Sequence, residues 1–375
     1  MLLVISMSTM INGLDLKMIK KAGKAIREGK LVIFPTETVY GIGANGFDEV
    51  AVKNIFRVKG RASDNPLILH VGNFDMIDMV CKNINSTERR LIDTFFPGPL
   101  TVVLEKSDLV PDAVSGGLAT VGVRMPNNEI ARNLINFSGV PVAAPSANIS
   151  GKPSGTCVFD IDDSLKDNVS FVIDGGSTLV GIESTVVRVV SGVVNILRPG
   201  KISLEDFIDA GFDAVYNKNI FNDVKLNDKV MSLGMKYKHY APNVECLLIY
   251  SEDNEKFVSK VHEFESDYNI LVVCMENNFE KFKNAISMGS SLEEVSHNIF
   301  HILRELDKTN YDLVIVEGVK KKGLGVAIMN RLIRACSYNY IYRTKDKSTY
   351  LENLTVPFFC FIDIILDILH RLKFR

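Results

Sequence analysis

Several features that would indicate secretion, metal binding or redox chemistry are missing from the sequence. The 375 residues include no tryptophan and six scattered cysteines, none of them in the C-x-x-C spacing typical of zinc and redox sites. Residues 1–11 lack the basic start and the long apolar run of a signal peptide. We therefore expect a cytoplasmic protein whose thiols are reduced and buried.

Long apolar runs are missing as well. The candidate stretch, 358–369, is shorter than the roughly 18 to 20 residues that a membrane span requires. It also carries Asp363 and Asp367 four positions apart, on one face of a helix. We predict no transmembrane span and interpret this stretch as an amphipathic helix that packs on a domain or a partner.

Neither sign of charge dominates, because 43 Lys and Arg residues face 45 Asp and Glu residues, for a net charge of -2. We therefore expect no stable nucleic acid complex, and any anion site must come from local clusters. The phosphate-binding pattern G-x-x-x-x-G-K-[ST] is absent. His297 and His301 lie four residues apart without the Glu of H-E-x-x-H, so we predict no metal held by the protein.

The length and the apolar pattern predict two α/β domains. The first, residues 1–212, is expected to open with a helix at 15–28, followed by short apolar strands with turns between them. Many strands and few long helices predict a mixed sheet. The expected strands lie at 31–34, 67–71, 100–104, 140–144, 171–173, 185–190 and 193–197.

A change in composition marks the end of the first domain. Residues 213–242 are rich in Asn, Asp and Lys and are interpreted as an interdomain linker. Residues 243–337 then predict a small parallel α/β domain, and residues 338–375 a tail. The strands of the second domain are expected at 244–250, 270–275 and 313–316, with a helix at 292–306 that a capping box of Ser291 and Glu294 opens.

Glycines and hydroxyls follow the first expected strand. The run 41–46 formally matches G-x-G-x-x-G, but Lys59, Gly60 and Arg61 stand near the position where a dinucleotide site has an acidic residue. We therefore favour a tight turn there. The overlapping segment 34–43 is either a ligand loop of an α/β sheet or an ordinary polar turn.

Two cations separated by one glycine form the next candidate. Gly60 could let a phosphate approach the backbone while Lys59 and Arg61 neutralise it. The alternative is an ordinary solvated surface. Asn65 and His70 flank the strand that follows and are further candidates.

The stretch 141–154 places small hydroxyls and an amide directly after an apolar strand. Ser146 has no histidine and acid in a recognisable partner pattern, so hydrogen bonding to a nucleotide is easier to defend than covalent catalysis. Arg124 and Arg198 occur in turn-like segments that bound strands. If the strands share one sheet, four cations reach a common site suited to a polyanion such as ATP: Lys59, Arg61, Arg124 and Arg198.

Taken in order, these segments resemble the two-domain form of threonylcarbamoyl-AMP synthase, whose catalytic part is the YrdC-like domain. The resemblance implies an α/β fold with a YrdC-like twisted mixed sheet, a concave anion-binding surface and a smaller Rossmann-like parallel α/β domain. It covers about residues 11–336. Its motifs lie at 35–43, 59–61, 95–101, 123–126, 145–148, 183–187 and 197–200, with 234–242 and 323–331 typical of the longer form.

The resemblance implies a nucleotidyltransferase, an L-threonylcarbamoyladenylate synthase. It would form threonylcarbamoyl-AMP and pyrophosphate from L-threonine, bicarbonate and ATP, with Mg²⁺ carried on the phosphates. The product would pass to the machinery that completes threonylcarbamoyl adenosine in tRNA. Alternatives are an RNA-binding module or a carbamoyl-transfer enzyme of another pathway.

The resemblance also assigns residues by motif position. Arg124 would take the threonine carboxylate, and Tyr237 in the linker would cover the nucleotide as part of a lid. The implied catalytic residues are Lys59, Arg61 and Asn148. The implied threonine site is Thr38, His70, Arg124, Ala144 and Ser184, and the implied ATP site is Arg61, Asn65, Thr120, Ser146, Ser154, Arg198 and Tyr237.

Overall fold

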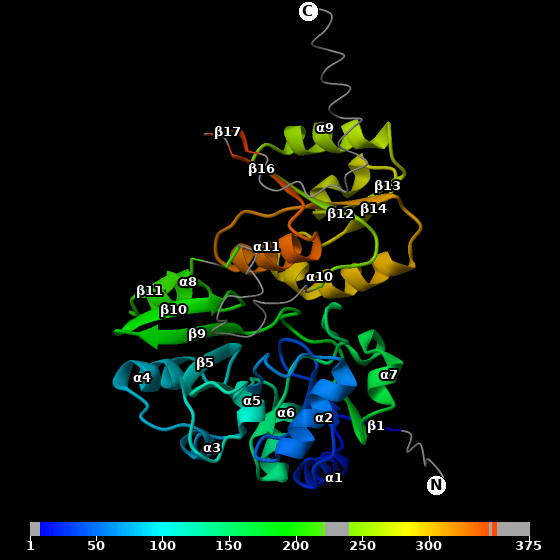
Figure 1. Ribbon diagram of the computed structural model, residues 1–375. Helices are drawn as coiled ribbons and strands as arrows, with labels where there is room; N and C mark the ends of the chain where they lie inside the picture. The colour runs from blue at the N-terminus through cyan, green and yellow to red at the C-terminus, as the bar shows by residue number, and fades with distance from the viewer. Residues whose placement is uncertain (1–7, 219, 222–239, 345–346, 351–375) are drawn as a thin grey trace, which may run out of the picture.

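The computed structural model describes residues 8–218, 220–221, 240–344 and 347–350. They form two sheets, each with its own helices (Figure 1). We call the sheet of β1 to β11 with its helices the first part, and the sheet of β12 to β17 with its helices the second part. Tyr237 and the amphipathic stretch 358–369 lie outside the described residues, as does most of the predicted linker. No helix in the described ranges is both long and apolar enough to cross a membrane.

The first sheet is mixed and has eleven strands in the order β1-β8-β2-β3-β7-β4-β6-β5-β9-β10-β11. It contains both parallel pairs, such as β4 with β6, and antiparallel pairs, such as β5 with β6. The expected twisted mixed sheet is therefore confirmed. Its strands are β1 (Thr9–Asn12), β2 (Val32–Phe34), β3 (Gly41–Asn45), β4 (Ile68–His70), β5 (Leu100–Glu105), β6 (Thr120–Arg124), β7 (Val142–Ala143), β8 (Phe171–Asp174), β9 (Thr185–Val190), β10 (Val193–Arg198) and β11 (Ala214–Tyr216).

Amphipathic helices cover this sheet. The backbone N–H of Met18 donates to the capping carboxylate of Asp15 at 3.1 Å, which starts α1. A Cβ on Gly23 would lie 2.8 Å from the backbone nitrogen of Ser138, so α1 and α6 need glycine at their contact. The helices of this part are α1 (Leu16–Arg27), α2 (Glu49–Lys59), α3 (Asp75–Val80), α4 (Ser86–Phe95), α5 (Asp112–Ser115), α6 (Glu129–Ser138), η1 (Val158–Asp160), α7 (Asp163–Lys166) and α8 (Leu204–Asp209).

All seven expected strands of this part are present, but the expected tight turn at 41–46 is wrong. Gly41–Asn45 is strand β3, paired antiparallel with β2 and β7. A Cβ on Gly43 would lie 2.6 Å from the side chain of Val142 and 2.8 Å from that of Phe34. The glycines therefore allow close strand packing instead of a turn. The segment around Arg124, expected to be turn-like, is strand β6.

The second sheet has the order β14-β13-β15-β12-β16-β17 and is parallel except for the last pair. This agrees with the expected Rossmann-like parallel domain. Residues 340–344 and 347–350 were expected in a tail but form β16 and β17, because β16 finds hydrogen-bond partners along β12. Its strands are β12 (Cys246–Ser251), β13 (Ile270–Cys274), β14 (Ala285–Ser287), β15 (Leu313–Glu317), β16 (Tyr340–Thr344) and β17 (Lys347–Tyr350).

Two helices of this second part face the first sheet. Figure 1 shows α10 and α11 on the side turned toward the first part, and α9 on the opposite side. Val39 and Ile182 of the first part belong to a buried apolar cluster made mainly by the second. The domain limits at 212, 242 and 337 stay predictions. The helices are α9 (Asn254–Glu265), η2 (Glu276–Lys281), α10 (Leu292–Glu305), η3 (Leu306–Lys308) and α11 (Leu324–Ala335).

Candidate active site

A cavity lies where several strands of the first sheet end. His70 and Arg124 are register partners at the carboxyl ends of the parallel strands β4 and β6, an edge at which α/β sheets commonly hold ligands. The four cations predicted to share a site all line this cavity. Ten predicted site residues line it in total: Thr38, Lys59, Arg61, His70, Arg124, Ala144, Ser146, Asn148, Ser184 and Arg198.

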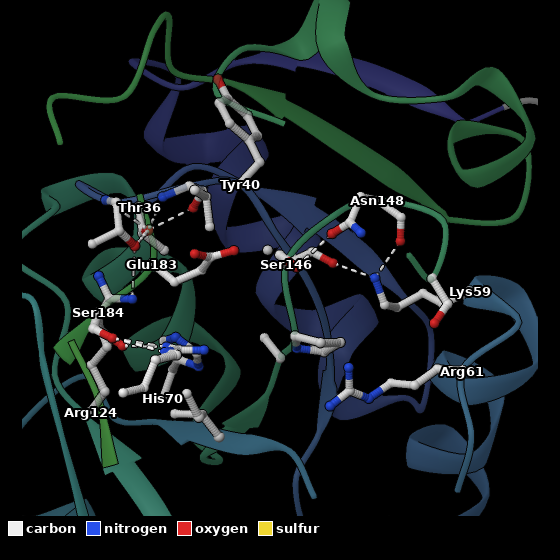
Figure 2. A pocket seen from close by; sticks show the side chains of 18 of the residues that line it. Thr36, Tyr40, Lys59, Arg61, His70, Arg124, Ser146, Asn148, Glu183 and Ser184 are labelled. Carbon is white, nitrogen blue, oxygen red and sulfur yellow. Dashed lines mark hydrogen bonds between the residues drawn. The ribbon is translucent and has the colours of Figure 1, made fainter. Parts of the chain in front are cut away.

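Figure 2 shows one group of these residues around Lys59. The buried ammonium of Lys59 donates to the backbone carbonyl of Ser146 at 2.6 Å and also to that of Asn148. The Ser146 hydroxyl donates to Oδ1 of Asn148 at 2.5 Å. Burial, followed by the nearby charge of Arg61, holds the pKa of Lys59 well below its usual value. We call Lys59, Ser146 and Asn148 the lysine group.

Gly60 connects this group to Arg61. It ends α2 in the left-handed region, with φ of 61°, and a Cβ there would meet no atom within 4 Å. Its backbone conformation therefore explains the glycine without any phosphate contact. The guanidinium of Arg61 donates to the carbonyl of Pro66 at 3.1 Å and, less closely, to that of Asn65 at 3.4 Å.

A second group surrounds Arg124. Nη1 of Arg124 donates to the Thr38 hydroxyl at 2.9 Å, and Nη2 lies 2.7 Å from Oε2 of Glu37, although not at the angle of a hydrogen bond. Within the described part of the chain, Nε of Arg124 has no hydrogen-bond partner. We call Thr38, His70, Arg124 and Ser184 the arginine group.

His70 is a neutral member of the arginine group. Burial, and then the adjacent charge of Arg124, lowers the pKa of His70 to about 3. Its Nδ1 is buried and meets no hydrogen-bond partner among the described residues. A neutral imidazole of this kind can bind a polar ligand group without adding charge.

Ser184 connects the arginine group to Arg198. The Ser184 hydroxyl lies 2.8 Å from that of Thr101, and Nη2 of Arg198 donates to the same hydroxyl at 3.1 Å. The carbonyl of Ser184 accepts from Nε of Arg198 at 3.1 Å and from Nη2 at 2.9 Å. Arg198 is therefore fixed against Ser184, the serine that the family resemblance places in the threonine site.

Three predicted ATP residues do not line the cavity. Ser154 donates to Oε1 of Glu183 at 2.8 Å and so lies behind that carboxylate. Asn65 offers its carbonyl to Arg61, and Thr120 begins β6 at the end opposite Arg124. Ser154 and Asn65 can act through the residues that they contact.

Several lining residues were not among the predicted site residues. Tyr240, three positions after the predicted Tyr237, reaches the cavity and stacks on Phe300 of α10, with ring centroids 5.0 Å apart. Tyr240 belongs to the recognised motif at 234–242, and the assignment of Tyr237 stays a prediction because that residue lies outside the described ranges. The others are Thr36, Val39, Tyr40, Gly41, Ile68, Pro145, Ser150, Gly151 and Glu183.

Two carboxylates, Glu183 in the cavity lining and Glu37 beside it, contact protein groups. Glu37 faces Arg124, and Glu183 accepts from Ser154 and from Arg331. Across the ranges that the structure describes, no group of three or more His, Cys, Asp or Glu side chains could hold a metal ion.

Two family models match the chain. The model of the Sua5, YciO and YrdC proteins, described as telomere recombination, matches residues 24–200. Strands β2 to β10 of the first sheet therefore belong to a domain of the Sua5, YciO and YrdC class. A model described as the C-terminal domain of threonylcarbamoyl-AMP synthase matches residues 202–337. Together the two matches leave out β1 of the first sheet and β16 and β17 of the second.

The relatives identify the family more closely. The threonylcarbamoyl-AMP synthase of Pyrococcus abyssi is 42% identical over 331 residues, which are 86% of this chain and 95% of that protein. The Bacillus subtilis enzyme of the same name is 37% identical, covering 84% and 92%. A solved structure of P. abyssi Sua5 complexed with L-threonine is 40% identical, with a TM-score of 0.81 over 89% of this chain and 99% of that one. The chain belongs to the threonylcarbamoyl-AMP synthase family.

Proposed function

We propose that this chain makes threonylcarbamoyl-AMP and pyrophosphate from L-threonine, bicarbonate and ATP. The observation that carries the proposal is the meeting of two groups of cations and hydroxyls in one cavity, Arg124 with Thr38 and Ser184, and Arg61 with Ser146. The family membership supports the same activity. A cavity with two such groups suits a reaction in which an amino acid and a nucleotide are held together.

In the proposed reaction, the threonine amine first combines with bicarbonate to give a carbamate, and water is released. A carbamate oxygen then attacks the α-phosphorus of ATP, the bond to the bridging oxygen breaks, and pyrophosphate leaves with the bonding electrons. The protein mainly has to hold two anions in contact and stabilise the charge on the leaving group. Magnesium, bound to the phosphates, would supply further charge neutralisation there.

The roles of the residues follow from their donors. Arg124 has Nε available beside Thr38, so it would bind the threonine carboxylate, with the neutral His70 next to it. Arg61, Ser146 and Arg198 would bind ATP. Lys59 would act by holding the backbone of the loop that carries Ser146.

The RNA-binding alternative fits this cavity less well. A protein that binds RNA phosphates usually presents cations on an open surface. Here Lys59 and Arg124 are buried and bonded to protein groups. Cytoplasmic location and delivery of the product to the tRNA-modifying machinery remain parts of the proposal.

The test is release of pyrophosphate by the purified full chain with ATP, bicarbonate and Mg²⁺, with and without L-threonine. We expect release that depends on threonine, and a product with the mass of threonylcarbamoyl-AMP. Alanine in place of threonine is the control, because it lacks the hydroxyl. Pyrophosphate release that is the same with and without threonine would refute the proposal.

A further inference from the structure

An ionised carboxylate in an anion-binding cavity needs an explanation. Glu183 lines the cavity and is buried. Burial alone would raise its pKa, but the charges of Arg331 and then Arg198 hold it at about 2. Glu183 is therefore negatively charged at neutral pH, next to the place where phosphates are expected.

The balancing charge comes from a helix that belongs with the second sheet. Arg331, on α11, is fully buried, and its Nε donates to Oε2 of Glu183 at 3.0 Å. Its Nη1 donates at 2.8 Å to the carbonyl of Pro199, the residue after Arg198. One side chain of the second part thus contacts both Glu183 and the turn that carries a cavity cation.

We infer that Arg331 is a positioning residue of the active site, which neutralises Glu183 so that a cavity built on the first sheet can accept the phosphates of ATP. The inference rests on the proposed function. Without Arg331, Glu183 would repel the phosphates and would compete with them for the guanidinium of Arg198. Arg331 of the second part would therefore contribute to nucleotide binding indirectly, through Glu183, without contacting the nucleotide itself.

The test measures binding of a non-hydrolysable ATP analogue with Mg²⁺ to the full chain by calorimetry. Arg331→Met should weaken this binding by roughly thirtyfold or more, the order expected when one partner of a buried charge pair is removed. Arg331→Lys should recover part of the affinity, because it restores a charge without the planar fork. The double variant Arg331→Met/Glu183→Gln should recover most of it, because it removes the uncompensated charge.

A pH series separates this role from a purely structural one. In Arg331→Met the pKa of Glu183 loses its largest lowering influence, so burial raises it. The analogue should then bind the variant more tightly, relative to wild type, as the pH falls and Glu183 is protonated. In the wild type Glu183 stays ionised over this range, because its pKa is about 2.

The matched control is Arg304→Met. Arg304 lies on α10 and donates to the carbonyl of Pro153, so it contacts the first part without touching Glu183. We expect a smaller loss of affinity and no gain at low pH. An equal loss in Arg304→Met, or a folded double variant that stays as weak as Arg331→Met, would overturn the inference. If the wild type fails to bind the analogue at all, the proposed function fails instead.

Discussion

The lysine group and the arginine group differ in where their donors go. In the lysine group, Lys59 donates to two backbone carbonyls, and Ser146 and Asn148 bond to one another. In the arginine group, Nε of Arg124 and Nδ1 of His70 have no hydrogen-bond partner within the described residues. The first arrangement fixes the shape of a loop, whereas the second keeps buried polar atoms ready for a ligand.

The two groups also differ in what supports them. The hydrogen bonds of the lysine group join α2 to the loop after β7, both in the first part of the chain. In contrast, Ser184 accepts a hydrogen bond from Arg198. The carbonyl of Pro199, the residue after Arg198, accepts a hydrogen bond from Arg331 of α11. Part of the site therefore depends on helix α11 of the second part. This contrast predicts which substitutions affect threonine and which affect ATP.

The largest effect is expected for Arg124→Met. It removes the proposed carboxylate ligand and leaves Glu37 buried without its partner. Losses of one partner of a buried charge pair cost about 2 to 5 kcal/mol, so threonine-dependent pyrophosphate release should fall by roughly 30-fold to several thousandfold. Steady-state kinetics should place most of the loss in kcat/KM for threonine.

The control for this substitution is Arg132→Met. Arg132 is on α6, donates to the carbonyl of Pro126 and is not among the residues that line the cavity. It should retain nearly all of the activity. If Arg124→Met instead weakens ATP and leaves the threonine KM unchanged, the assignment of the arginine group to threonine is wrong.

A smaller effect is expected for Lys59→Met. It leaves the carbonyl of Asn148 without the Lys59 donor, whereas the carbonyl of Ser146 keeps the backbone N–H of Asn148 at 3.1 Å. One unsatisfied buried carbonyl costs about 1 to 3 kcal/mol. We expect the KM for ATP to rise by about tenfold or more, because about 1.4 kcal/mol corresponds to a tenfold change in affinity. The threonine KM should change less.

Arg57→Met provides the comparison, because Arg57 is an exposed cation on the same helix. Kinetics and thermal unfolding of both variants separate a local effect at the loop from a loss of helix stability. Equal losses in the two variants would contradict the role given to Lys59.

The smallest effect concerns stability and pH. The pKa of His70 is about 3 in the folded chain, against about 6.5 for an ordinary histidine. Between these values the unfolded chain binds a proton at this position and the folded chain does not. The free energy of unfolding should therefore decrease as the pH is lowered below about 6.5. This residue would contribute up to about 1.4 kcal/mol per pH unit to the decrease.

His70→Gln should remove this part of the pH dependence, which denaturant unfolding at pH 7, 6 and 5 would measure. His262→Gln, at an exposed histidine, is the control. An unchanged slope in His70→Gln would mean that His70 is not held neutral by burial.

Local patterns predicted much of the first sheet. All seven apolar strands expected from residues 31–197 are present, because a short run of β-branched and large apolar residues has few stable alternatives to a buried strand. The strand Gly41–Asn45 could not be predicted in this way, because glycine has a low intrinsic preference for strands. Gly43 is required by the side chain of Phe34 on the preceding strand and by that of Val142, which is distant in sequence.

The tail shows the same limit. Tyr340–Thr344 forms a strand because β12 offers it a free edge, with Leu248 in register with Tyr340. Nothing in the charged sequence after Tyr338 indicates that partner. Strand formation by such a segment depends on the neighbour that it pairs with more than on its own composition.

The sequence by itself determined the chemistry of this protein: which cations, hydroxyls and amides are present, and the motif order that carries the family resemblance. The tertiary structure decided how these groups are used. It directed the donors of Lys59 to backbone carbonyls, left Nε of Arg124 without a partner, and brought Arg331 to Glu183 across 148 positions of sequence. The physical reason is that hydrogen bonding and burial depend on neighbours in space, which composition and spacing do not specify.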